Sequence, residues 1–422
     1  MPVIPDQLRV LATSLHLYIP RSIIEQIVVP QRKLNHKIVF TLKTNQKRVN
    51  QTEVELKTSE FMIPIPPVIK NILLIRLGAI GDVVQTLPTV EQLKINFPEA
   101  KIHWAIESKS YPIVEHHPGI EFHIFPKEKL RFNKPLSALL SLNRFRLKLQ
   151  EVQFDLAIDL QGLMKSGLVA WMSNARKSIG FHHLNTREGN SLLLDTTLPP
   201  LKERIMHRID FYQQIIEHLG GRLEPLEDPF AFTFTEPEQK NLKVLLHRLR
   251  IKKPFFLLNL GASKQTKRWT SQGFANLIKR IQSTYPKHYF LLTGAGKEDS
   301  LFELEILKLL PPHSVQSAVN KTSLRELALL TQQAAFLISG DSLALHLGSA
   351  FKTPSIGLFG GSALAVETGP YWAPYPGLDH KIPCYPCRKR TCSHHSCMVN
   401  LSAEQVFQTL LKLYKPPTKG KS

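Results

Sequence analysis

The sequence predicts an α/β protein built from two doubly wound parallel-sheet domains that face each other across a central cleft. Three observations favour this class. Short apolar runs of strand length alternate with longer segments of helical period, as in a parallel sheet covered by helices. These runs form two sets, separated by a Gly-, Pro- and Glu-rich stretch at 220–239 that suits a hinge. The chain has 422 residues, 43% of them hydrophobic, which is enough for two domains.

The expected elements follow from these runs in order. The first 66 residues carry no chemical motif and end in the proline-rich IPIPPVIK, which resists helix and sheet. Strands of the first set are expected at 72–77, 101–107, 122–126, 154–160 and 177–181. Strands of the second set are expected at 255–260, 288–294, 335–340 and 354–360. Helical stretches include 271–285, 323–333 and 401–414, the last with a capping box formed by Ser402 and Gln405.

The predicted domain boundaries divide the chain into four parts. Residues 1–66 form an N-terminal extension, and 67–230 form the first sheet domain. Residues 231–400 form the second sheet domain, including a cysteine-rich loop at 384–397, and 401–422 form a final helix and tail.

The charge of the chain is strongly basic, with 54 Lys and Arg against 34 Asp and Glu, a formal net charge of +20. Such a charge attracts nucleic acid, anionic lipid headgroups or phosphorylated substrates, and does not choose among them. No run approaches the length of a membrane span, and the first residues do not read as a secretory signal. We therefore expect a cytoplasmic globular protein.

All four cysteines lie close together, which excludes a disulfide-stapled secreted scaffold. Cys384, Cys387, Cys392 and Cys397 have the spacing C-x2-C-x4-C-x4-C. Four thiolates in one loop can wrap a tetrahedral structural zinc, and a zinc with four protein ligands has no open position for catalysis. An iron–sulfur cluster and metal-free thiols are the alternatives.

Candidate chemistry lies at strand ends, because ligands of open α/β sheets bind beyond the carboxyl ends of the strands. The first strand runs into RLGAIGD, where Gly81 permits close backbone approach and Asp82 stands at the head of a helix. The spacing does not match the dinucleotide fingerprint GxGxxG. Asp82 is either a helix cap or, ionised at the edge of a cleft, a general base.

Three strand ends of the second set offer candidate sites for parts of a nucleotide. The loop after 255–260 carries Ser263, Thr266 and Lys267, a combination of hydroxyls and cations that suits a diphosphate. The next carries Glu298, placed for a ribose hydroxyl, and the third opens a helix with Asp341, Ser342 and His346. A solvated basic loop and a packed core histidine are the structural alternatives.

These stretches, in this order, resemble glycosyltransferase family 9, the ADP-heptose:lipopolysaccharide heptosyltransferases. The most specific pieces are LIRLGAIGDVVQTLP, FDLAIDLQGLMKSG, the KRW after the strand at 255–260, and SGDSLALHLGSA with TPSIGLFG. The resemblance runs from about 71 to 414. It implies a GT-B fold of two Rossmann-like domains, with the acceptor mainly in the first and the nucleotide sugar mainly in the second.

The resemblance also implies roles for individual residues and an inverting reaction that needs no metal. Asp82 matches the family's general base on the acceptor hydroxyl, and Lys267 matches the lysine that neutralises the donor phosphates. The remaining donor-side positions are Ser263, Thr266, Glu298, Asp341, Ser342 and His346, and the acceptor-side positions are Gly81, Gln161 and Lys165. Asp159 is interpreted as a buried or capping acid. Ser342-Leu343-Ala344 stands where the family usually has Thr-Gly-Leu, which bears on the identity of the donor.

The implied function is transfer of a heptose from ADP-heptose to an acidic lipopolysaccharide inner-core acceptor. The basic surface would then help encounter at the cytoplasmic face of the inner membrane, and no specific nucleic acid is expected. Alternatives are a family-9 transferase with another nucleotide sugar or acceptor, a non-catalytic basic module that binds nucleic acid, and a family-9 scaffold that has lost activity.

Overall fold

The computed structural model describes strands at 27–28, 38–42 and 50–54, residue 66, and residues 68–416 except 131–134, 187, 202–204 and 253. The chain divides into two compact units, residues 1–62 and 63–422. In the first unit β1 (Ile27–Val28), β2 (Ile38–Leu42) and β3 (Asn50–Val54) form an antiparallel sheet in that order. The rest of the extension expected at 1–66, apart from Pro66, lies outside the described residues.

The second unit begins with a parallel six-stranded sheet in the order β6-β5-β4-β7-β8-β9. Its strands are β4 (Asn71–Ile75), β5 (Lys101–Glu107), β6 (Ile120–Phe125), β7 (Leu156–Asp159), β8 (Lys177–Gly180) and β9 (Thr196–Thr197). Its helices are α3 (Ile80–Asn96), α4 (Pro135–Gln150), α5 (Met164–Ser173) and α6 (Arg208–His218). The five strands expected from the first set of apolar runs are all present.

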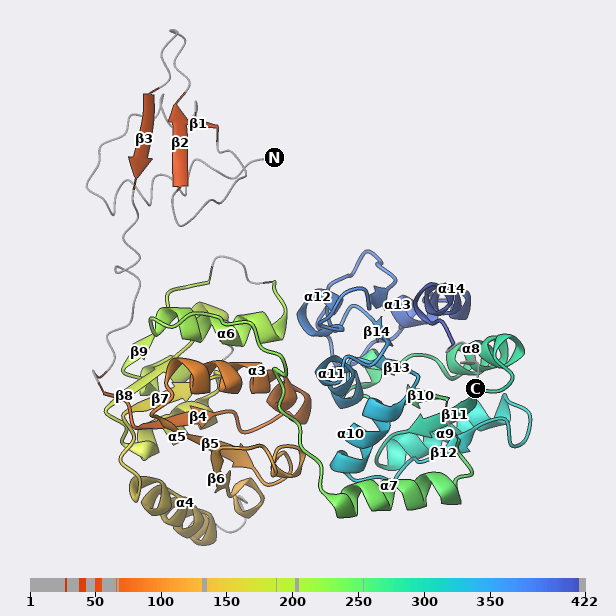
Figure 1. Ribbon diagram of the computed structural model, residues 1–422, viewed down its shortest axis with the longest axis horizontal. Coiled ribbons are helices and arrows are strands. Elements are labelled where there is room, and N and C mark those ends of the chain that lie inside the picture. The colour runs from red at the N-terminus through yellow and green to blue at the C-terminus, as the bar shows by residue number, and fades with distance from the viewer. Residues whose placement is uncertain are drawn as a thin grey trace, which may run out of the picture. The chain divides into compact units, whose positions relative to one another are not determined.

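A second parallel sheet follows, in the order β12-β11-β10-β13-β14-β15. Its strands are β10 (Phe255–Asn259), β11 (Tyr289–Thr293), β12 (Gln316–Ser317), β13 (Phe336–Gly340), β14 (Ser355–Phe359) and β15 (Gly377–Asp379). The helices are α7 (Glu236–Arg248), α8 (Ser271–Thr284), α9 (Lys297–Lys308), α10 (Leu324–Gln333), α11 (Leu343–Ala350), α12 (Ala365–Thr368), α13 (Ser396–Val399) and α14 (Ala403–Leu413). Figure 1 shows the two sheets side by side, each flanked by helices.

The apolar runs form strands because the central strands are covered on both faces. Every residue of β10, β13 and β14 is buried, and only a continuous apolar run satisfies that environment. Helix α8 buries only one face, on which Phe274 and Ile278 lie. No helix among the described residues is long and apolar enough to span a bilayer.

The two sheet-containing halves touch each other along α3 and α11. Leu347 of α11 belongs to the same hydrophobic cluster as the core of the first sheet. Polar contacts between the halves reinforce it: Tyr371 Oη donates to Asp210 Oδ1 at 2.8 Å, and Arg325 Nη1 donates to the Ile113 carbonyl at 3.4 Å. The segments after β4 and β13 therefore meet between the halves.

Candidate active site

Asp82 lies in the first turn of α3 as its third residue, so the N-terminal cap of that helix is Ala79 and not Asp82. Its carboxylate forms an ion pair with the Arg76 guanidinium at the end of β4. Arg76 is buried, donates through Nη1 to the Leu160 carbonyl at 3.1 Å and lies over the Tyr212 ring. The Asp82 side chain is 33% exposed, so one face of the carboxylate remains open to an incoming molecule.

The electrostatic environment of Asp82 favours its ionised form. Burial alone would raise the pKa of this carboxyl, but the neighbouring charges of Arg76, Arg208, His346 and Lys267 outweigh it and hold the pKa below its usual value. Two of these neighbours, Lys267 and His346, belong to the second half of the molecule. The structure thus brings the predicted base into the electrostatic field of the predicted donor residues.

Lys267 is held at the mouth of the second sheet by Asp341. The two side chains form an ion pair and both are largely buried, with exposed fractions of 17% and 6%. A Cβ on Gly340 would lie 2.9 Å from the Lys267 carbonyl oxygen, so the loop approaches β13 this closely only because position 340 is glycine. Lys267 and Asp341 therefore form one unit, which sequence spacing alone does not reveal.

His346 packs directly on the predicted acceptor-side glycine. A Cβ on Gly81 would lie 2.6 Å from His346 Cδ2, so the halves approach here only because this position has no side chain. His346 Nε2 lies 3.8 Å from Asp341 Oδ1. Burial lowers the pKa of His346 despite the acids around it, so the neutral imidazole is favoured at neutral pH.

The remaining predicted donor-side residues differ in exposure and in hydrogen bonding. Ser263 is exposed on the loop after β10, and Ser342 Oγ accepts from Asn259 Nδ2 at 2.9 Å. Glu298 is exposed in the first turn of α9. The Thr266 hydroxyl is buried and donates to the Lys389 carbonyl at 2.9 Å. The proton of the Thr266 hydroxyl is thus donated to the cysteine-rich loop, and the predicted contact of Thr266 with a donor stays a prediction.

The predicted acceptor side contains a buried acid that the sequence analysis missed. Glu107, the last residue of β5, is buried and pairs with Lys165 at 2.6 Å and with Lys127 at 2.7 Å. Both lysines are partly exposed beyond it, so Glu107 orients two cations at the carboxyl ends of the strands. Gln161 Oε1 accepts from the Leu77 backbone N–H at 2.7 Å, which holds the loop after β7 against the loop after β4.

Asp159 is the buried acid that the sequence suggested. Its carboxylate accepts from the backbone N–H groups of Gln161 and Gly162, from Ser166 Oγ and from Asn190 Nδ2. Burial still raises its pKa against these four hydrogen bonds. Asp159 therefore shapes the loop that carries Gln161 and Lys165.

The cysteine-rich loop packs against the loop after β14. Gly361 N donates to Cys397 Sγ at 3.4 Å, and a Cβ on Gly361 would lie 3.3 Å from Cys387 Sγ. Cys384 Sγ lies 4.0 Å from His394 Nε2, and the His395 N–H bond to Cys392 Sγ lowers the pKa of that thiol. No three ligand atoms of this loop, within the described part of the chain, lie within 4.8 Å of one another.

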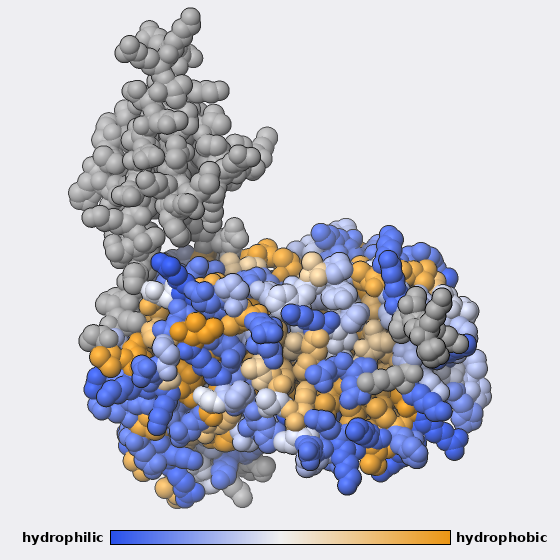
Figure 2. Space-filling model, viewed as in Figure 1, coloured by the Kyte–Doolittle hydropathy of each residue, from blue (hydrophilic) through white to orange (hydrophobic). Residues whose placement is uncertain are grey.

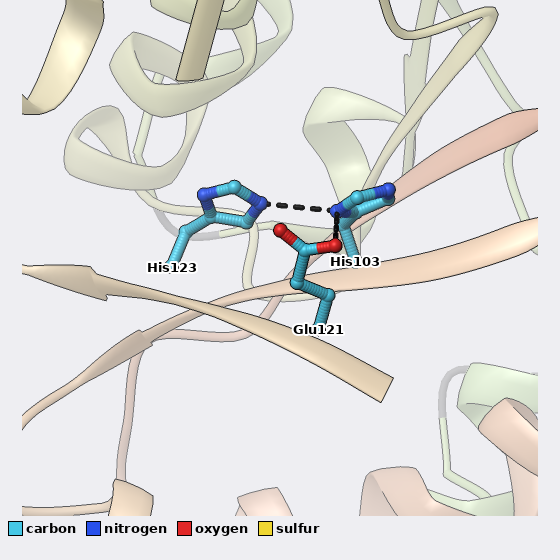
Figure 3. A group of neighbouring side chains, drawn as sticks. All are labelled: His103, Glu121 and His123. Carbon is cyan, nitrogen blue, oxygen red and sulfur yellow. Dashed lines mark hydrogen bonds and ion pairs between the residues drawn. The ribbon is translucent and has the colours of Figure 1, made fainter. Parts of the chain in front are cut away.

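A separate cluster of potential metal ligands spans β5 and β6, where Figure 3 shows two imidazoles and a carboxylate converging. His103 Nδ1 lies 3.1 Å from His123 Nε2 and 3.7 Å from Glu121 Oε2. Both histidines are buried and Phe154 packs on their edges. Burial lowers the pKa of His103 and lowers that of His123 to about 4, which fits a hydrogen bond between neutral rings.

The comparisons with known proteins agree with one another. A family model described as glycosyltransferase family 9 (heptosyltransferase) matches residues 142–398, more than half of the chain. Lipopolysaccharide heptosyltransferase 1 of Campylobacter coli is 26% identical over 310 residues, covering 69% of this chain and 84% of the relative. Lipopolysaccharide core heptosyltransferase OpsX of Haemophilus influenzae is 24% identical, covering 75% of this chain and 85% of the relative.

Solved structures share the fold. A family 9 glycosyl transferase from Veillonella parvula has a TM-score of 0.68 at 21% identity, covering 82% of this chain and 97% of its own. The E. coli ADP-heptose lps heptosyltransferase II has a TM-score of 0.65 at 18% identity, with coverage of 81% and 98%. The two-sheet architecture is therefore the GT-B fold, as expected. The family model starts after Asp82, so the role of that residue depends on its motif and its geometry.

Proposed function

The chain belongs to glycosyltransferase family 9, the heptosyltransferases, and on that premise we propose that it moves a heptose from ADP-heptose to a lipopolysaccharide inner-core acceptor. The observation that carries this proposal is the position of Asp82. Its carboxylate is held ionised by Arg76 and lies within the field of Lys267 and His346 from the opposite half. The proposed base, Asp82, comes from the first half and the proposed donor cation, Lys267, from the second, and the two lie close enough for Lys267 to lower the pKa of Asp82.

The reaction can be written from these groups. Asp82 accepts the proton of an acceptor hydroxyl while that oxygen bonds to the anomeric carbon of the sugar. The bond between this carbon and the donor phosphate oxygen breaks, and its electron pair leaves with ADP. Because attack comes from the face opposite the leaving diphosphate, the configuration of the anomeric carbon inverts.

Negative charge that develops on the leaving diphosphate needs a fixed positive partner. Lys267, anchored by Asp341, supplies one, and the N–H groups at the start of α11 supply partial positive charge. We therefore assign charge neutralisation to protein groups, so that transfer needs no catalytic metal. Lys127 and Lys165, oriented by Glu107, suit an acidic acceptor on the other side.

The test is ADP release from ADP-heptose with a deacylated lipopolysaccharide-core acceptor, in the presence of a metal chelator. We expect acceptor-dependent release from the wild type and a loss of at least about 100-fold in Asp82→Asn, the scale of lost general-base catalysis. Glu305→Gln, which changes an exposed acid of α9, is the matched control and should keep full activity. Equal rates in the two variants would contradict the role of Asp82. Dependence on added magnesium would contradict metal independence of the transfer step.

We also propose that the cysteine-rich loop holds a structural zinc. Four thiols suit this ion chemically, and Cys387 and Cys397 both lie at Gly361, although the loop must tighten to bring all four together. The zinc would fix the loop that bonds Thr266, next to Lys267. Metal analysis should find one zinc per chain in the wild type and none in Cys387→Ser. An equal zinc content in the two proteins would refute the assignment.

A further inference from the structure

Helix α4 carries two apolar stripes where a helix on the surface of a sheet needs only one. The inner stripe contains Phe145 and Leu149, which belong to the buried cluster beneath the first sheet. The outer stripe contains Leu136, Leu140 and Leu147, whose exposed fractions are 69%, 57% and 52%. Figure 2 shows hydrophobic side chains among hydrophilic ones at the surface in the region of α4.

The helical period places these leucines on one line. At about 100° per residue, Leu140 and Leu147 point within about 40° of Leu136, and Phe145 points about 180° away from it. Leu139 lies at one side of the line and is also exposed, at 63%. The outward leucines therefore form a continuous apolar stripe directly opposite the stripe that packs on the protein.

Cations border this outer stripe on both sides. Arg144 and Lys148 project about 80° to 120° to one side of the Leu136 direction, and Arg146 projects about 80° to the other. The helix sequence PLSALLSLNRFRLKLQ contains no acidic residue. The short helix Lys127–Lys129, which contacts α4, adds two further lysines and one acid, Glu128. An apolar stripe between basic borders is typical of a helix that lies in the interface of an anionic membrane.

Self-association explains the same stripe less well. Two copies related by a two-fold axis along α4 would bury the leucines, but they would also bring Arg144, Arg146 and Lys148 of each copy against the same residues of the other. Repulsion between these like charges opposes pairing of the two helices, whereas the phosphates of lipids neutralise the charges. The charge pattern therefore favours a lipid surface over a second copy.

We propose that α4 docks the protein on an anionic phospholipid leaflet, with Leu136, Leu140 and Leu147 inserted among the lipids. This inference rests on the proposed function, in which the acceptor is carried by a membrane lipid. Only residues 130–134 separate α4 from the short helix that carries Lys127, which Glu107 holds on the acceptor side. Docking through α4 would therefore hold the acceptor-binding cations near the membrane surface.

The test is co-sedimentation of the full chain with phosphatidylcholine vesicles and with vesicles that also contain phosphatidylglycerol. We expect binding to the anionic vesicles, weakened at least about tenfold in the double variant Leu140→Glu and Leu147→Glu, because inserted leucine area is lost. The matched control is Leu301→Glu and Leu304→Glu on α9, where both leucines are 54% exposed. This control should bind like the wild type. Arg144→Gln should weaken binding roughly fivefold, and only to anionic vesicles.

Two results would overturn the proposal: equal vesicle binding by the α4 variant and the α9 control, or a wild-type dimer in gel filtration that the α4 variant converts to monomer. Vesicle binding needs no donor and no turnover, so it is separate from the transferase test. The α4 variant should also keep full ADP release with a deacylated acceptor and lose activity only with vesicle-borne acceptor. If ADP release fails in every protein while α4-dependent binding persists, the proposed function fails and the docking surface stands.

Discussion

Replacing Arg76 by Met should move the pH dependence of the transfer reaction, because this guanidinium is the ion-pair partner of Asp82. Burial raises the pKa of Asp82, and Arg76 is the strongest of the charges that lower it. An arginine beside an aspartate typically lowers the carboxyl pKa by about 1–3 units. In the pH profile of kcat/KM, the acid limb of Arg76→Met should therefore lie about 1–3 pH units above that of the wild type. The sign follows because Asp82 is active only when ionised, and activity is lost as the pH falls through its pKa.

The assay is ADP release over a pH series, combined with thermal unfolding of each protein. Arg76 also donates to the Leu160 carbonyl and lies over Tyr212, so the Met variant should be less stable as well. Arg76→Lys keeps the charge, and its acid limb should stay within about one unit of the wild-type position. If Arg76→Met is folded and loses the same factor of activity at every pH, Arg76 does not act through Asp82 and the reasoning is refuted.

Three further predictions test other parts of the structure. Glu107→Gln should raise the acceptor KM about tenfold with little change in the donor KM, because two cations lose their common partner; equal changes in both would contradict it. Arg325→Met should lower the free energy of unfolding in urea by about 3 kcal/mol, since it removes the cation that pairs with Glu238 and that donates to the Ile113 and Thr233 carbonyls; an unfolding curve with unchanged midpoint and slope would contradict this prediction. The pKa of His123 is lowered to about 4, so the folded state excludes a proton that the unfolded chain binds below about pH 6.5. Lowering the pH from 7.5 to 5 should therefore reduce the free energy of unfolding by about 2 kcal/mol on account of this histidine. The reduction should be smaller in His123→Gln.

The strand cores were predictable because burial on both faces demands uninterrupted apolar runs. The edge strands β9, β12 and β15 were not, because two or three residues at a sheet edge carry no such run. The division of the chain into two sheets followed from the break in the pattern at 220–239. Contacts between the halves, such as the bond from Tyr371 to Asp210, join residues 161 positions apart and leave no local signal.

The location of the candidate site was predictable where a residue lies in the segment that follows a strand, as for Asp82, Lys267 and Asp341. It was not predictable where the partner comes from another strand. Glu107 ends β5 and holds lysines 20 and 58 residues away, and nothing in KIHWAIE shows that its acid is buried. Arg76 stands inside the motif itself, directly after β4. A cation at the end of a buried strand, six residues before an acid, is the signal that would have found it.

In the proposed reaction, the position of Lys267 near Asp82 would give the donor a part in activating the base. Asp82 has a lowered pKa partly because the charge of Lys267 lies near it, and a carboxylate with a low pKa is ionised but weakly basic. In the proposed reaction the donor diphosphate binds at Lys267 and offsets that positive charge. The pKa of Asp82 then rises towards its usual value, and the carboxylate becomes a stronger base only when the donor is in place. Because Gly81 lets His346 pack against α3, the two halves are close enough for this coupling.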